Sequence, residues 1–380
     1  MNGNKYLEIK AELLVNGIDA TKEALSGLGD RYKEQNHGLF GWDFEDHAGT
    51  LLPDDFLLPD GTVVQFRRNS KSPYQVRFEN GRLTLSNGEE DLCAIRWLLR
   101  PQYYDTVTTN RHKMVKIGQI GGEDCLFFCY QNYCSHFARG EQCLFCNLVS
   151  TTNTYNSVLK KKDTEDIGEV AKAAFNEGMV KHVLLTGGCF SHEREIGLVS
   201  EILASIKRHT GLECIPGTIL PSPAKNADEI KRYYESGIKA IGFSMEIWDE
   251  KLYKGICPGK SSTMSHEAFI TSIQEAVKIF GAGNVYGVFV MGLEPKVTFL
   301  EGVKRLTDLG ANVVPFVWSP NPGSKLEGHR APTGQWFVET VLAAAEIVQK
   351  SGVPSGTENH CYKCDGNSLL HDALRLKGIE

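Results

Sequence analysis

Three cysteines stand close together on one short polar segment of the chain. Cys134 and Cys143 are separated by eight residues, and Cys143 and Cys146 by two. Thiolates are soft ligands that select iron–sulfur clusters or zinc. Three thiols leave one coordination position open, whereas a structural zinc site normally takes four ligands. His136 could be that fourth ligand, so a zinc-stapled loop stays an alternative to an iron–sulfur site.

The segment that carries these thiols follows the first of six apolar runs, which alternate with helical patterns. The apolar runs are 125–130, 182–185, 212–216, 240–244, 285–291 and 313–317, and the helical patterns fall near 164–178, 193–209, 226–236, 265–279, 298–309 and 334–350. Short apolar strands, each followed by a helix, predict parallel strands buried on both faces. The predicted fold is therefore α/β, a partial (β/α)6 TIM-like barrel. Functional residues are then expected on loops at the carboxyl ends of the strands.

Residues 1–120 lack this alternation and are predicted to form a small N-terminal α+β extension. Asp-Gly at 60–61 and Asn-Gly at 80–81 are hairpin signals. The apolar run at 92–99 predicts a short helix that ends before Pro101.

The predicted barrel occupies residues 121–352, and residues 353–380 form a short C-terminal tail that contains Cys361 and Cys364. A C-x2-C pair is half of a metal site, so the tail is a possible second metal site. The alternative is a cysteine pair that packs over the mouth of the barrel.

The composition limits the classes of partner. Of 380 residues, 41 are Lys or Arg and 47 are Asp or Glu, which gives a net charge of −6. A mildly acidic chain without a basic patch argues against nucleic acid as a partner. The sequence shows no apolar run behind its first residues and no apolar stretch of the roughly 18 residues that a membrane span needs. We therefore expect no membrane partner and a cytoplasmic location, where eleven cysteines indicate metal binding or catalysis before disulfides.

The cysteine segment resembles the cluster motif of the radical S-adenosylmethionine (SAM) enzymes, C-x3-C-x2-C after the first barrel strand. Cys143 and Cys146 keep the two-residue spacing, and Phe145 occupies the aromatic position before the last cysteine. The first gap is eight residues rather than three, as in an atypical branch of the superfamily. The resemblance implies that Cys134, Cys143 and Cys146 bind a 4Fe–4S cluster with one open iron.

The end of the second strand is similar to the family's Gly-Gly-Glu motif, which meets the methionine end of SAM. Thr186, Gly187 and Gly188 are followed here by Cys189 in place of the glutamate. Glycine suits a position where the backbone approaches a ligand closely. The resemblance therefore implies that these residues bind the cofactor.

Three further segments match the family in the correct order along the chain. Ser244 and Glu246, at the end of the fourth strand, resemble the ribose-binding position, and Val290 lies in the strand similar to the adenine-contacting one. The segment 319–324 resembles a Pro-Gly-Thr turn. Lys260 follows the fourth strand and either pairs with a carboxylate of cofactor or substrate or is a solvated lysine.

By this resemblance the chain is expected to cleave SAM reductively and to generate a 5′-deoxyadenosyl radical that takes hydrogen from a small-molecule or cofactor-precursor substrate. The electron would come from a reductant such as flavodoxin or ferredoxin. The residues do not indicate the substrate or the reaction subclass. Two alternatives are a non-radical zinc or iron–sulfur protein and a metal-dependent hydrolase, which the strand ends disfavour because they offer Gly, Ser, Thr and Glu rather than His and Asp.

Overall fold

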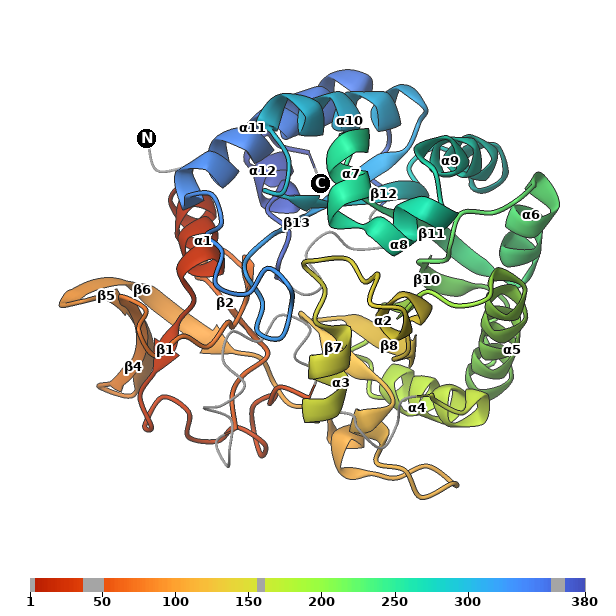
Figure 1. Cartoon of the computed structure of the whole chain (residues 1–380). Coiled ribbons are helices and arrows are strands. Elements are labelled where there is room, and N and C mark those ends of the chain that lie inside the picture. Colours follow the sequence, from red (N-terminus) through yellow and green to blue (C-terminus); the bar gives the residue numbers. More distant parts are fainter. Residues whose placement is uncertain (1–3, 37–50, 156–160, 357–365, 380) are drawn as a thin grey trace.

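The structure is a computed structural model that describes residues 4–36, 51–155, 161–356 and 366–379. Six parallel strands curl into a half-barrel, with a seventh strand, β7, antiparallel at the edge (Figure 1). Their order is β13-β12-β11-β10-β9-β8-β7. The strands are β7 (Gln119–Gly121), β8 (Cys125–Gln131), β9 (His182–Gly187), β10 (Ile215–Ile219), β11 (Ile238–Glu246), β12 (Val285–Met291) and β13 (Asn312–Val317). The predicted α/β partial barrel is confirmed.

Helices cover the outer face of this sheet (Figure 1). The covering helices are α4 (Thr164–Asn176), α5 (His192–Thr210), α6 (Ala227–Glu235), α9 (His266–Phe280), α10 (Lys296–Asp308) and α11 (Gly334–Ser351). Their starts are fixed by side chains such as Asp163 and Asn226, which accept hydrogen bonds from backbone N–H groups of the first turn. The apolar residues of strands and helices meet in one large core. Strand β10 begins three residues later than the sequence predicts, which leaves Glu213 exposed before the strand.

Four short helices lie in the loops after β8 and β11, at the carboxyl ends of the strands. They are α2 (Ser135–Ala138) and α3 (Leu148–Tyr155) after β8, and α7 (Glu250–Ile256) and α8 (Pro258–Thr263) after β11. They therefore stand at the rim where a barrel of this kind places its chemistry.

The N-terminal part holds helix α1 and a second, six-stranded sheet with the order β1-β4-β5-β6-β2-β3. The elements are α1 (Lys5–Asn16), β1 (Asp19–Ala20), β2 (Asp55–Leu57), β3 (Val63–Gln65), β4 (Tyr74–Glu79), β5 (Arg82–Asn87) and β6 (Glu90–Trp97), followed by the 3-10 helices Gln102–Asp105 and Met114–Lys116. An α+β extension is confirmed, and both predicted hairpins, β2–β3 and β4–β5, are present.

The predicted helix at 92–99 is wrong, because this segment is strand β6. Leu83 of β5 pairs with Ile95 in an antiparallel ladder. Ile95 and Trp97 are buried, whereas Ala94 and Arg96, which alternate with them, are exposed. This period of two is the pattern of a half-buried strand, and its pairing with β5 outweighs the local helix signal.

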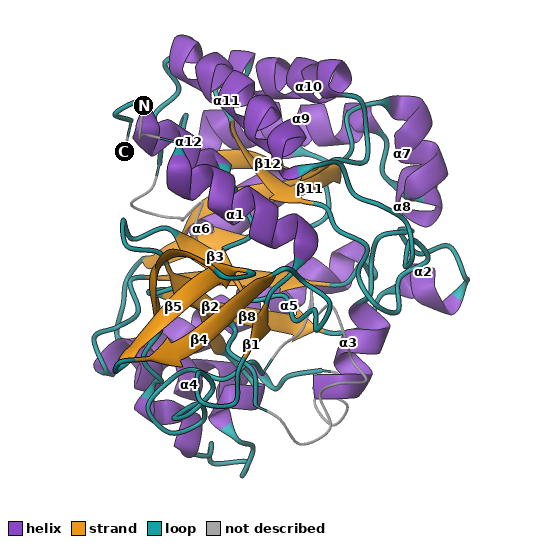
Figure 2. Ribbon diagram, turned by 90° about the vertical axis from the view of Figure 1, so that its left-hand side faces the viewer, coloured by secondary structure: helices purple, strands orange, loops and turns teal. Residues whose placement is uncertain are grey.

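The chain ends pack together on one side of the barrel. Helix α1 contacts α11, and so does the C-terminal helix α12 (Leu370–Leu376) (Figure 2). No helix within the described ranges is long and apolar enough to cross a membrane.

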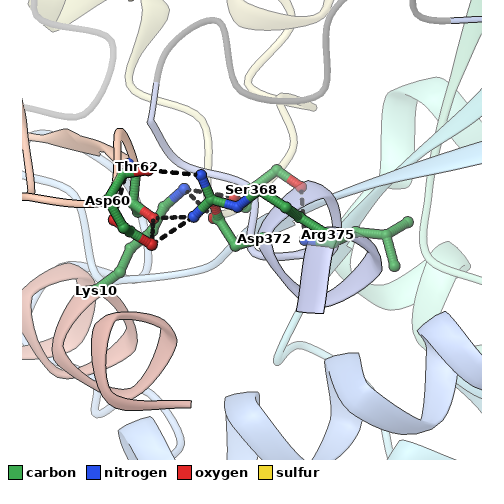
Figure 3. A network of polar contacts seen from close by, with 7 residues as sticks. Lys10, Asp60, Thr62, Ser368, Asp372 and Arg375 are labelled. Atoms are coloured by element: carbon green, nitrogen blue, oxygen red, sulfur yellow. Dashed lines mark hydrogen bonds and ion pairs between the residues drawn. The ribbon is translucent and has the colours of Figure 1, made fainter. Parts of the chain in front are cut away.

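Polar contacts tie α12 to the N-terminal part (Figure 3). The Nζ of Lys10 donates to the carbonyl oxygen of Ser368 and to Oδ2 of Asp372, both at 2.7 Å. The Nη2 of Arg375 contacts Oδ2 of Asp60 at 2.5 Å. Lys10 and Asp372 are both buried. The ion pair between Lys10 and Asp372 therefore fixes the C-terminal helix α12 to α1.

Candidate functional site

The residues from Cys134 to Cys146, here called the thiol loop, follow β8 at the carboxyl edge of the sheet. The end of β9 holds the start of this loop. The backbone N–H of Ser135 donates to the carbonyl oxygen of Cys189 at 2.8 Å, and the N–H of Gly188 donates to that of Gln131 at 2.8 Å. The two neighbouring strand ends are therefore joined by backbone hydrogen bonds.

The close approach of these two segments requires glycine at position 188. A Cβ atom there would lie 2.3 Å from the carbonyl oxygen of Tyr133 and 2.9 Å from Cβ of Cys134. Separations under 3 Å between such atoms are strongly repulsive. Gly188 is thus needed to seat the thiol loop.

The loop after β11 holds the far end of the thiol loop. The N–H of Leu144 donates to the carbonyl oxygen of Ile256 at 2.8 Å, and the N–H of Gly259 donates to that of Glu141 at 3.0 Å. These bonds come from α7 and α8. The thiol loop is consequently fixed by the ends of β9 and β11 as well as by its own strand.

Two further cysteines contact the thiol loop. The thiol of Cys189 forms a hydrogen bond with the sulfur of Cys134, which lowers the pKa of Cys134 and raises the pKa of Cys189. Cys257, at the junction of α7 and α8, forms a similar hydrogen bond with Cys143 and has a raised pKa. Five thiols therefore gather at this rim.

The third cysteine of the motif is the most deeply placed. Burial, followed by the nearby charge of Cys143, raises the pKa of the Cys146 thiol. Among the residues that the structure describes, no three His, Cys, Asp or Glu side chains are arranged to hold a metal ion. Joint binding by Cys134, Cys143 and Cys146 therefore stays a prediction. Their chemistry and burial suit a soft metal centre.

A small chamber lies beside the thiol loop at the strand ends. Its lining brings together four residues that the sequence singles out, Thr186, Gly187, Ser244 and Lys260, and adds the thiol of Cys189. These residues come from the ends of β9 and β11 and from α8. The fold therefore brings these four residues together, and their role in binding a cofactor stays a prediction.

Lys260 is not the solvated lysine of the alternative interpretation. Its Nζ lies 2.5 Å from Oε1 of Glu246 and donates to the carbonyl oxygen of Ser244 at 3.0 Å. Burial by itself lowers the pKa of Lys260, but the nearby negative charges, of which Glu246 is the strongest and Cys189 and Cys143 follow, together raise that pKa well above its ordinary value. The pair therefore carries both charges inside the rim.

The backbone of Glu246 is unusual. Its φ is +69°, in the left-handed region that residues other than Gly, Asn and Asp rarely adopt. The ladder between β11 and β12 also shifts register between Ser244 and Glu246. The strand end is thus bent at the residue that meets Lys260, a feature typical of functional sites.

Three other predicted residues lie away from this chamber. Gly188 seats the thiol loop, as described above. Phe145 is half-buried and packs against the main core, and Val290 is half-buried near the end of β12. Cys361 and Cys364 lie outside the described residues.

Sequence reasoning missed three residues that support the site. Glu294 accepts the N–H groups of Trp248 and Asp249, at 2.8 and 2.9 Å, and so holds the turn after β11. Its only signal was its place just after the fifth strand. The second residue is Cys257, whose thiol lies against the thiol loop, and the third is Lys162.

Lys162 corrects another expectation. The run at 160–162 is predicted to be a solvated turn, but Lys162 is buried and donates to the carbonyl oxygen of Cys129 at 2.6 Å and to Oδ1 of Asn132 at 2.7 Å. It therefore fixes the end of β8 just before the thiol loop.

A larger cavity of about 830 Å³ opens next to the chamber. The two hollows share Cys189, Ser222 and Met264 in their walls. Other walls of the cavity come from α2 of the thiol loop and from the starts of α5 and α9. A ligand in this cavity would therefore lie between the thiol loop and the strand ends.

The half-barrel, with a thiol-bearing loop and a polar chamber at the carboxyl ends of its strands, defines the class of this protein as a TIM-like barrel with its chemistry at one rim. Residues 129–306 match the family model of the Radical SAM superfamily, and this part of the chain is a radical SAM superfamily domain. The match begins within β8 and ends within α10, so it includes the thiol loop and the chamber.

The chain is also similar to individual known proteins. Bacteriochlorophyllide c C-7(1)-hydroxylase from Chlorobaculum limnaeum is 26% identical over 243 residues, which cover 60% of this chain and 60% of that protein. The chain thus matches less than two thirds of that relative. Among solved structures, methylornithine synthase (PylB) has a TM-score of 0.44 at 18% identity, covering 60% of this chain and 62% of that one. The FeFe-hydrogenase maturase HydG from Carboxydothermus hydrogenoformans has a TM-score of 0.46 at 16% identity, covering 60% and 51%.

Proposed function

We propose that this chain is a radical SAM enzyme that binds a 4Fe–4S cluster through Cys134, Cys143 and Cys146. The observation that carries the proposal is the position of these thiols, on a loop of the matched superfamily domain that directly follows its first barrel strand. The cluster with SAM bound would supply reductive cleavage of SAM to a 5′-deoxyadenosyl radical that takes hydrogen from a substrate.

We propose that SAM is held by residues of the chamber and by their neighbours at the ends of β9 and β11. Thr186, Gly187 and Gly188 would take the methionine end, because they stand at the end of β9 beside the thiol loop. Ser244 and Glu246 would take the ribose. The space between Gly188 and the thiol loop has no room for a side chain. Gly188 would therefore both seat the thiol loop and contact the methionine end of SAM.

Lys260, Phe145 and Val290 would complete the cofactor site. Lys260 pairs with the half-buried carboxylate of Glu246 and so fixes the position of that side chain at the proposed ribose site. Phe145 and Val290 are proposed to contact the cofactor from the thiol loop and from β12. The walls of the half-barrel would exclude water from the reacting atoms, because the protein has to prevent competing reactions of the radical.

The remaining parts of the proposal concern partners. We propose a small-molecule or cofactor-precursor substrate, an external reductant such as flavodoxin or ferredoxin, and the cytoplasm as location, because thiols stay reduced there. Residues 1–120, 121–352 and 353–380 are proposed as extension, barrel and tail, and Cys361 and Cys364 as a possible second metal site.

Anaerobic reconstitution with iron and sulfide tests this function. The wild-type chain should bind about four irons, turn brown, and form 5′-deoxyadenosine from SAM when dithionite is added. Cys134→Ala, Cys143→Ala and Cys146→Ala should each lose most of the iron and all of the cleavage. Cys214→Ala is the matched control, because Cys214 is exposed. A colourless chain that binds zinc instead would favour the non-radical alternative.

A further inference from the structure

The cavity of about 830 Å³ has a wall with unusual hydrogen-bonding groups. His136 is buried, with 3% of its surface exposed. Its Nδ1 lies 2.9 Å from Nη2 of Arg139. Because guanidinium nitrogens only donate, Nδ1 accepts, and the ring hydrogen of the neutral imidazole is therefore on Nε2. No described residue accepts a hydrogen bond from Nε2.

A second histidine of the wall is in a similar state. Nε2 of His192 lies 2.6 Å from Oε2 of Glu229. Its Nδ1 makes an ion-pair contact with Oε2 of Glu195 at 3.7 Å, which is beyond hydrogen-bonding distance, and this buried atom has no hydrogen-bond partner in the described part of the chain. Glu195 and Glu229 together raise the pKa of His192, which favours a hydrogen on both nitrogens. A buried donor without an acceptor is unfavourable, so such atoms point to a missing ligand.

Charges around the cavity favour an anion. Arg139 and the exposed Lys225 stand in the lining. Glu267 is the acidic residue of the lining, and it lies in the first turn of α9, where an acid complements the helix dipole. Glu141 pairs with Arg139, and Glu195 and Glu229 flank His192. No carboxylate among the described residues forms an ion pair with Lys225, so Lys225 supplies the positive charge that favours an anion.

Two helix starts add to this field. The 19-residue helix α5 begins at His192 and the 15-residue helix α9 at His266. Their N-cap residues, Ser191 and Ser265, both line the cavity. Helix N-termini carry partial positive charge and free N–H groups, which bind anions. Ser191 makes no capping hydrogen bond of its own.

From these observations we infer that this cavity is the substrate site, and that it holds its substrate by a carboxylate group near His136, His192 and Lys225. The inference rests on the proposed function, because it places the substrate beside the chamber proposed for SAM. The volume suits a complete small molecule, since such sites are typically about 300–1,000 Å³. The two oxygens of a carboxylate can accept hydrogen bonds from the N–H groups of both His136 and His192. The matching neutral amide has only one acceptor oxygen and can satisfy them only in part.

Binding of a small dicarboxylate to the cluster-free chain tests the carboxylate preference. Glutarate should raise the unfolding temperature of the wild-type chain, whereas glutaramide, the neutral diamide with the same carbon skeleton, should not. Charge-assisted hydrogen bonds are roughly twice as strong as neutral ones, so the half-saturating concentration of glutarate should rise about tenfold in Lys225→Met and in His192→Gln.

Lys231→Met is the matched control. Lys231 lies on α6, pairs with Glu235 at 3.6 Å on the surface, and its replacement removes the same charge outside the cavity lining. Equal stabilisation by glutarate and glutaramide, or the same loss of affinity in Lys231→Met as in Lys225→Met, would overturn the inference. Lys225 is exposed, so its variant should fold even if His192→Gln does not.

The two proposals fail in different ways. SAM cleavage by the reconstituted chain, without any carboxylate preference, would overturn the substrate assignment alone. A carboxylate preference at the cavity in a chain that never cleaves SAM would overturn the proposed function, and with it the role of the bound anion as a substrate.

Discussion

Replacing Gly259 by Ala should disturb the thiol loop without touching a cysteine. An added Cβ would lie 2.4 Å from Nδ1 of His136 and 2.6 Å from the carbonyl oxygen of Glu141. Non-bonded heavy atoms prefer separations of about 3.5–4.0 Å, so the loop must move by about 1 Å. Overpacking of this kind costs about 1–3 kcal/mol. The glycine is not required by its own φ, which is not among the positive values.

Gly255→Ala is the matched control for this variant. Gly255 lies in α7, and a Cβ there meets nothing within 4 Å. Alanine in a helix is favoured over glycine by about 0.5–1 kcal/mol, so this control should be slightly stabilised. Both variants gain the same helix stabilisation from alanine. The free energy of unfolding measured in urea should therefore be lower for Gly259→Ala than for Gly255→Ala by about 1–3 kcal/mol.

Iron content gives the local measurement. After anaerobic reconstitution, Gly259→Ala should bind less iron than wild type, and Gly255→Ala the same amount. The reasoning is refuted if Gly259→Ala matches Gly255→Ala in both stability and iron, because the contact between α8 and the thiol loop would then have no role in seating it.

Three further perturbations should show the same dependence on buried charge. Lys260→Met leaves the half-buried carboxylate of Glu246 without its ion pair, so urea unfolding should show a loss of about 1–3 kcal/mol; the double variant with Glu246→Gln should recover much of it, and no recovery would contradict the pairing. Lys10→Met leaves the buried carboxylate of Asp372 without its ion pair and should lower the free energy of unfolding by about 3–5 kcal/mol. Proteolysis near the C-terminus should be faster than in wild type, and unchanged proteolysis would argue against an anchoring role. Because the pKa of His192 is raised, its contribution to stability is complete below its unfolded pKa of about 6.5 and is lost as pH rises through the folded value. Wild type should therefore lose stability relative to His192→Gln between pH 6 and alkaline pH, and parallel pH curves would exclude this interpretation.

Much of the barrel could be predicted because its signal is local. A strand buried on both faces is a short apolar run, and each such run is separated from the next by a helical pattern. All six runs of the barrel were found in this way, at positions that correspond to β8 to β13. The segment at 92–99 failed because its apolar residues fit a helix or a strand equally well, and only the ladder between β5 and β6 decides between them.

The contacts within the site could not be predicted, because they join residues far apart in the chain. Cys134 meets Cys189, and Cys143 meets Cys257, although no spacing relates either pair. The same holds for Lys162, whose sequence neighbours suggest solvent while its burial depends on the end of β8. Residue types indicated the chemistry, but the fold determines which side chains meet.

The long first gap of the cysteine motif has a structural explanation. Both ends of the thiol loop are held by backbone hydrogen bonds, from Ser135 to Cys189 and from Gly259 to Glu141. Because these bonds use backbone atoms, they hardly restrict which residue types lie between them. The gap therefore has room for α2, a helix that a three-residue gap does not accommodate. Helix α2 brings His136, with its unpaired Nε2, to the wall of the large cavity. The departure from the usual spacing thus coincides with the groups proposed to bind the substrate carboxylate, so substrate choice and cofactor binding would depend on one loop.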